Sequence, residues 1–177
     1  MRVVVIVGST REGRVGDTVA SWFARVADRR DDVEVDLVDL AGFDFPARLP
    51  RRATAEMNRF TAAIDAADGF VVVTPEYNRS FPASLKQAID FAYDEWHAKP
   101  VGFVSYGCGS RGDGAVAALR VVFAELHTVT MRDHVAVDVM AAEPGAADEP
   151  AATALLDQLV WWGEALRVAR ADRPYIA

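Results

Sequence analysis

The chain is poor in cysteine, in long apolar runs and in positive charge, and each shortage excludes a class of function. A single cysteine, Cys108, permits no disulfide within the chain and no cysteine-built metal cluster. The apolar run from Val3 to Val7 is too short for a signal peptide or a membrane span. Lysine and arginine number 19 against 26 acidic residues, and this net charge of -7 argues against nucleic acid as the main partner. We therefore expect a cytoplasmic protein that binds neither nucleic acid nor membranes.

Apolar residues, by contrast, are abundant: they make up 51% of the chain, beside 25% charged residues. This balance is typical of a globular protein and not of a disordered one. A length of 177 residues suits one hydrophobic core, and no internal repeat or domain boundary divides the chain. We expect a single domain over residues 1–177.

Short β-branched runs alternate with segments of helical periodicity along the chain. The runs predict strands at residues 2–7, 33–40, 69–73, 101–106 and within 128–139. Between and after them, helices are expected at residues 19–26, 51–67, 82–96, 115–126 and 151–169, with an acidic linker at 143–150. This alternation predicts an α/β fold whose parallel sheet has right-handed crossovers and helices on both faces.

The loop after the first strand, residues 8–18, suits a phosphate. Its glycines let backbone N–H groups converge, and the helix that follows adds the positive end of its dipole. Ser9, Arg11 and Thr18 add side-chain donors. On pattern alone the loop is equally compatible with an ordinary strand-to-helix turn.

The loop after the third strand places polar and aromatic groups at the same edge of the sheet. It begins before Pro75, which lacks the N–H that a central strand needs, and it exposes Glu76, Tyr77 and Asn78. It ends at Pro82, which suits the first turn of a helix. Ligands in open α/β sheets bind outside the carboxyl ends of the strands, where this loop lies.

The loop after the fourth strand, residues 107–114, contributes mainly backbone. Four of its eight residues are glycine, which leaves little steric obstacle to a flat ligand lying against the main chain. The three loops together therefore offer a phosphate site, polar and aromatic side chains, and an accessible backbone.

Two motifs in these loops carry a resemblance to a known family. They are Gly8-Ser9-Thr10-Arg11 and Pro75-Glu76-Tyr77-Asn78, the second followed by Ser80, Pro82, Leu85-Lys86 and Ala88-Ile89-Asp90. In this order, each just after an expected strand, they resemble the signature of the NADPH-dependent FMN reductase family of flavodoxin-like proteins. The resemblance implies a flavodoxin-like, doubly wound, five-stranded sheet of order 2-1-3-4-5. It also implies FMN as cofactor, NADPH or NADH as co-substrate, and a homodimer or homotetramer.

The resemblance further implies which residues bind FMN. The first loop would hold the phosphate, the second would border the isoalloxazine, and the third would approach its pyrimidine side. The expected cofactor-binding residues are Ser9, Arg11, Arg14, Gly16, Asp17, Thr18, Pro75, Glu76, Tyr77, Asn78, Ser80, Ser105, Tyr106, Gly107 and Gly109. Many relatives have Ser and Asn in place of Arg14 and Gly16, so two side-chain donors are missing, and the charge of Arg14 is the expected replacement. Arg79 or Arg111 is the expected contact of the NADPH phosphates.

The expected reaction is hydride transfer from NADPH to FMN, followed by electron transfer to a small-molecule acceptor: a quinone, azo compound, metal ion or free flavin. No catalytic side chain is assigned, because the cofactor carries the redox chemistry. Two alternatives stay open. One is an FMN electron-transfer protein that a partner protein reduces, and the other is a flavodoxin-like binding domain that has lost its cofactor.

Other chemistry is disfavoured by the residues themselves. Cys108 has no evident histidine partner for nucleophilic catalysis. His97, His127 and His134 lack the spacing of metal ligands, so no metal site is expected. One tryptophan of the pair Trp161-Trp162 is expected to face a partner chain, because aromatic residues are enriched at interfaces.

Overall fold

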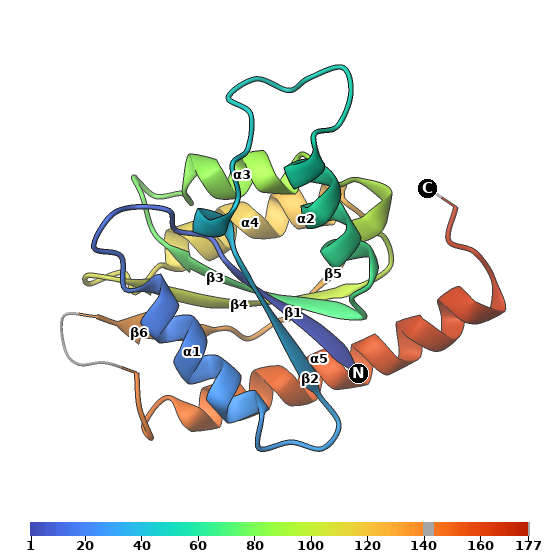
Figure 1. Ribbon diagram of the computed structural model, residues 1–177. Coiled ribbons are helices and arrows are strands. Elements are labelled where there is room, and N and C mark those ends of the chain that lie inside the picture. The colour runs from blue at the N-terminus through green and yellow to red at the C-terminus, as the bar shows by residue number, and fades with distance from the viewer. Residues whose placement is uncertain (140–143, 177) are drawn as a thin grey trace.

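The computed structural model describes residues 1–139 and 144–176, and it places a parallel sheet between two layers of helices (Figure 1). The strands are β1 (Arg2–Val7), β2 (Glu34–Asp39), β3 (Gly69–Pro75), β4 (Pro100–Gly107), β5 (Val129–Thr130) and β6 (Val135–Asp138). The helices are α1 (Gly16–Ala27), α2 (Ala55–Asp65), α3 (Ala83–Ile89), α4 (Asp113–Glu125) and α5 (Glu149–Asp172), with 3-10 turns η1 (Leu40–Gly42) and η2 (Asp94–Trp96). Neither α5, the longest, nor any other described helix has the length and apolar character needed to cross a membrane.

The strands lie in the order β2-β1-β3-β4-β5, and β6 also pairs with β4; each of these pairs is parallel. The order expected from the sequence is confirmed. The fifth strand consists of two short segments. Between them, the guanidinium of Arg120 on α4 donates to the carbonyl oxygens of Met131 (2.5 Å) and Arg132 (2.7 Å). The strand breaks here because these backbone groups bond to a side chain instead of to β4.

Both faces of the sheet are covered by helices, as the unbroken apolar run of β1 predicted (Figure 1). Val3, Val5 and Val7 pack with residues of α1 and α5 on one face. Val4 and Ile6 pack with residues of α2, α3 and α4 on the other. The central strands are thus fixed from both sides, and the loops at their carboxyl ends start from rigid positions.

Pro75 belongs to β3, whereas the sequence analysis placed the exit from the sheet before it. The N–H of the next residue, Glu76, donates to the carbonyl oxygen of Tyr106 on β4 at 3.3 Å. Successive residues of a strand direct their N–H groups to opposite sides, so the nitrogen of Pro75 faces the β1 side. β1 has already ended there, at Val7, which pairs with Val73. The missing N–H therefore costs no ladder bond.

The helix expected over residues 82–96 is shorter, since α3 ends at Ile89. The indole N–H of Trp96 lies 3.2 Å from the carbonyl oxygen of Ile89 and 3.1 Å from that of Ala92. A continuing helix would use these oxygens for its own next turn. Pro82 directly precedes α3 and does not lie within its first turn.

Other boundaries move for local reasons. The helix expected from residue 51 begins at Ala55, because the Thr54 side chain accepts a hydrogen bond from the Met57 N–H at 3.2 Å and caps it. Helix α5 begins at Glu149, inside the expected linker, and it extends to Asp172. Residue 143 of that linker lies outside the described residues.

Candidate functional site

A cavity of about 470 Å³ opens at the carboxyl edge of the sheet, where the loops after β1, β3 and β4 meet. The expected site residues that line it are Ser9, Arg11, Arg14, Pro75, Glu76, Tyr77, Asn78, Tyr106 and Gly107. The expected residues Gly16, Asp17, Thr18, Ser80, Ser105 and Gly109 are not among its lining residues. The structure therefore brings the three loops, which are far apart in sequence, around one space.

Of the described residues, five more line this cavity: Val15, Arg79, Cys108, Ser110 and Val139. Arg79 was expected only as a contact for NADPH. Cys108 and Ser110 lie inside the glycine-rich loop, so their position in that loop was a usable signal. Val139 follows β6, and nothing in its sequence context pointed to the site.

Arg14 braces the first loop against the end of β2. Its guanidinium forms a two-pronged ion pair with Asp39 and donates to the carbonyl oxygen of Ser9 at 2.6 Å. The hydrogen bond from Arg14 holds the pKa of the Asp39 carboxyl below its usual value. The charge of Arg14 is thus shared with a carboxylate, while Arg11 is exposed at the cavity.

The second loop makes a tight two-residue turn. Tyr77 and Ser80 exchange backbone hydrogen bonds of 2.8 and 2.9 Å, and the central residues Asn78 and Arg79 have φ angles of 51° and 65°. Left-handed backbone costs a non-glycine residue about 1–2 kcal/mol, less for asparagine. This conformation is unfavourable for the two residues, but it places Tyr77 and Asn78 in the wall of the cavity.

Glu76 connects the second loop to the third. Its Oε2 accepts hydrogen bonds from the Ser110 hydroxyl at 3.0 Å and from the Gly114 N–H at 2.9 Å, in the first turn of α4. A carboxylate at a helix N-terminus is also favoured by the helix dipole. Glu76 therefore sets the distance between two walls of the cavity.

Tyr106 starts in the third loop and reaches the first. Its backbone ends β4 beside Gly107, but its hydroxyl lies against the first residue of α1: a Cβ on Gly16 would stand 2.6 Å from that oxygen. Burial raises the pKa of the Tyr106 hydroxyl to about 12, against a smaller opposing effect of the Ser9 hydroxyl. The phenol is accordingly protonated at neutral pH.

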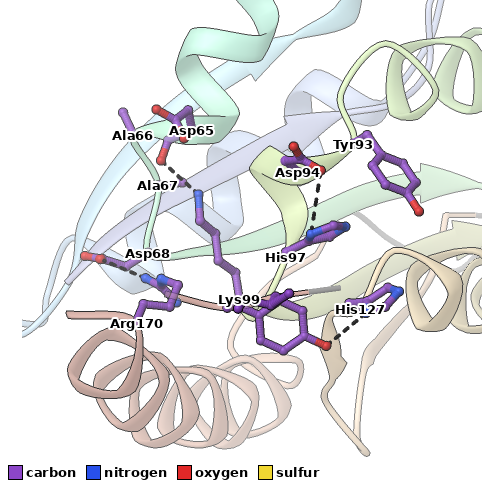
Figure 2. A pocket seen from close by; sticks show the side chains of 12 residues that line it. Asp65, Ala66, Ala67, Asp68, Tyr93, Asp94, His97, Lys99, His127 and Arg170 are labelled. Atoms are coloured by element: carbon purple, nitrogen blue, oxygen red, sulfur yellow. Dashed lines mark hydrogen bonds and ion pairs between the residues drawn. The ribbon is translucent and has the colours of Figure 1, made fainter. Parts of the chain in front are cut away.

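A second cavity, of about 690 Å³, lies at the opposite edge of the sheet, beside the residues that precede β3 and β4 (Figure 2). Its two cations are already engaged. Lys99 donates to the carbonyl oxygens of Ile64 (2.9 Å) and Asp65 (2.8 Å), and Arg170 donates to Ala98 (2.6 Å) and lies 3.7 Å from Asp68. None of the described residues that line this cavity belongs to the N-terminus of an α-helix or to a glycine-rich loop, so it suits a phosphate less well than the first.

Lys99 makes stability depend on pH. Burial, and secondly the charge of Arg170, lower its pKa from 10.5 to about 8. Between these values the unfolded chain binds a proton that the folded chain lacks, so this group's contribution to stability rises with pH from about 8 to 10.5. Relative to Lys99→Met, the wild type should gain on the order of 1–2 kcal/mol between pH 7 and pH 10. Urea unfolding of both proteins at the two pH values measures the gain, and parallel pH profiles would contradict it.

The parallel sheet, the strand order and a cavity at the switch point between β1 and β3 define a flavodoxin-like α/β protein with a cofactor-sized crevice. A family model described as NADPH-dependent FMN reductase matches residues 1–142. The chain belongs to this family.

Individual relatives agree with that assignment. An NAD(P)H-dependent FMN reductase of Schizosaccharomyces pombe is 37% identical over 125 residues, which cover 64% of this chain and 62% of that protein. A 2-hydroxy-1,4-benzoquinone reductase of Burkholderia is 34% identical over 142 residues, or 74% of each chain. The chain spans 59% to 65% of the length of the three fungal FMN reductases it matches.

Solved structures show the same fold. The flavoenzyme NAD(P)H:(acceptor) oxidoreductase of Paracoccus denitrificans superposes with a TM-score of 0.78 at 24% identity, over 93% of this chain and 97% of that one. An azoreductase of Bacillus anthracis superposes with a TM-score of 0.58 at 15% identity. At such identities the likeness concerns the arrangement of the elements, which here is the flavodoxin-like sheet.

Proposed function

We propose that the chain is a single-domain, FMN-dependent NAD(P)H oxidoreductase of the cytoplasm that passes electrons from NADPH to a quinone, azo compound, metal ion or free flavin. The observation that carries the proposal is the cavity at the β1/β3 switch point, whose walls are built from both family motifs and the glycine-rich loop. Relatives named as quinone reductases support a small-molecule acceptor such as a quinone.

The residues around the cavity fit FMN. Ser9, Arg11 and the N-terminus of α1 offer donors and positive potential for its phosphate. Tyr77 offers an aromatic surface, and the backbone at Gly107 offers polar groups for the ring system. When bound, FMN would supply the redox chemistry by accepting a hydride and passing electrons onward. The protein residues then bind and orient FMN and hold the loops around it. Arg79 at the cavity wall is our candidate for a contact with the NADPH phosphates.

We also propose that the protein acts as a homodimer or homotetramer. Trp161 and Trp162 are both exposed on α5, and their rings contact each other at 4.9 Å between centroids. Exposed tryptophans of this kind are typical of surfaces that a partner covers.

The test is the visible spectrum of the protein after incubation with FMN and desalting, recorded again under anaerobic conditions with NADPH. We expect a retained flavin band that NADPH bleaches. A retained band that NADPH leaves unchanged would favour the electron-transfer protein instead, and the absence of FMN binding in a titration would favour the cofactor-less domain.

The second loop gives the matching mutational prediction. The double variant Tyr77→Ala, Asn78→Ala should bind FMN about tenfold more weakly, because it loses an aromatic wall and a polar contact. Tyr93→Ala removes a comparable side chain from the opposite edge and should leave FMN binding unchanged. Fluorescence titration measures both dissociation constants, and an unchanged value for the double variant would refute the role of this loop.

A further inference from the structure

We propose that Tyr106 is a positioning residue of the phosphate site, whose hydroxyl holds the Ser9 hydroxyl as a donor to the phosphate of FMN. The inference rests on the proposed function, because it requires a phosphate-bearing ligand in the first loop. It gives Tyr106 a role at the phosphate end of the cofactor, whereas the third loop as a whole was expected to approach the ring system.

The first observation is the space that the hydroxyl occupies. A Cβ at position 16 would lie 2.6 Å from the Tyr106 hydroxyl oxygen and 3.4 Å from Cζ of the same ring. Contacts below 3.0 Å require something to shift. The tyrosine thus uses the volume that a side chain at the first residue of α1 would take, and Gly16 is what permits it.

The second observation is that the hydroxyl makes no hydrogen bond of normal geometry within the part of the chain that the structure describes. Tyr106 is 4% exposed, and its oxygen is buried without a hydrogen bond. Buried hydroxyl groups are rarely left unpaired, since the lost hydration is not recovered. If this donor gains a hydrogen bond when a ligand binds, that bond contributes favourably to the free energy of binding.

The third observation identifies the group through which the hydroxyl acts. The Tyr106 residue lines the cavity, but its hydroxyl oxygen is buried, and the Ser9 hydroxyl is close enough to influence the ionisation of that oxygen. Ser9 is itself buried and lies in the cavity wall. Because the phenol is protonated, it can donate to Ser9 Oγ and leave the serine proton for a phosphate oxygen. Such a chain of hydrogen bonds strengthens each member.

The N-terminus of α1 lies at the same place and has no side-chain cap at Val15. Its first-turn N–H groups and dipole favour an anion. Ser9, oriented by a hydrogen bond from Tyr106, would add a hydroxyl donor to these backbone donors.

The test uses Tyr106→Phe, Ser9→Ala and the double variant, with dissociation constants for FMN and riboflavin measured by fluorescence titration. Phenylalanine keeps the ring and removes only the oxygen. We expect Tyr106→Phe to weaken FMN binding about tenfold and to change riboflavin binding less than about twofold, since riboflavin lacks the phosphate. Ser9→Ala should show the same selectivity. The double variant should bind FMN no more weakly than Ser9→Ala, because both changes act on one contact.

Stability without FMN separates this role from a structural one. Removal of an unpaired buried hydroxyl should leave the urea midpoint of the free protein unchanged or higher. Tyr93→Phe, at the opposite edge, is the matched control and should change the dissociation constant of neither FMN nor riboflavin. The inference is overturned by unchanged FMN binding in Tyr106→Phe, by equal losses for FMN and riboflavin, or by additive losses in the double variant. A wild-type protein that binds no FMN would instead overturn the proposed function, and this inference with it.

Discussion

Gly112→Ala is expected to destabilise the fold by about 3 kcal/mol and to weaken FMN binding. Gly112 precedes α4 with a φ of 92°, a left-handed conformation that costs alanine about 1–2 kcal/mol. A Cβ there would also lie 2.6 Å from Cβ of Ser105 and 2.9 Å from the backbone nitrogen of Tyr106. Relief of that overlap must move the end of β4 or the start of α4, at a cost of about 1–3 kcal/mol.

Gly109→Ala is the matched control for this prediction. Gly109 lies in the same loop with a φ of 72°, but nothing stands within 4 Å of the position its Cβ would take. Gly109→Ala should therefore lose only the conformational contribution to stability, about 1 kcal/mol. Urea unfolding and FMN titration of both variants measure the difference. Equal losses in stability would show that the close approach of Gly112 to β4 is unimportant.

Trp96→Ala should have a still larger effect on stability, about 4 kcal/mol. The ring is fully buried and contacts the rings of Phe70 (4.7 Å between centroids), Phe123 (5.4 Å) and Phe60 (6.3 Å). Its removal leaves a cavity between β3, α2 and α4. It also removes the indole N–H from the carbonyl oxygens of Ile89 and Ala92, at and just after the end of α3, which adds the cost of unpaired polar groups.

Two variants make the Trp96 experiment specific. Trp161→Ala removes the same side chain from a position that is 64% exposed, and it should cost less than about 1 kcal/mol in the monomer. Trp96→Phe keeps part of the ring volume but removes the N–H, so its loss should fall between the two. Because Trp96 does not line the candidate site, the folded fraction should bind FMN normally. Similar losses for Trp96→Ala and Trp161→Ala would contradict the role of the aromatic cluster.

Much of the fold was predictable because its signals are local. The run from Val3 to Val7 is apolar at every position, and only a strand covered on both faces needs that pattern. The boundaries that moved depend on contacts between distant residues. Arg120 breaks the fifth strand, and Trp96 ends α3, each through a side chain that bonds to backbone of another element or turn. No periodicity reports such bonds.

The candidate site also has features that the sequence could predict and features that it could not. The sequence predicted correctly that the three loops lie at one edge of the sheet, since parallel strands bring their carboxyl ends together and each loop follows a strand. It could not show that Arg14 is committed to Asp39, or that Glu76 joins two loops. These hydrogen bonds join residues that are 25 and 38 positions apart, and they depend on the registers of β1 with β2 and of β3 with β4.

By itself, then, the sequence determined the class of fold, the strand order through its family motifs, and the three loops that meet at one edge of the sheet. Only the tertiary structure decided what each side chain in those loops does. Tyr106 shows the reason most clearly: its neighbours in sequence belong to the third loop, but its ring is long enough to cross to the first. The position of a hydroxyl depends on side-chain length and packing, and these are fixed only when the strands and helices come together.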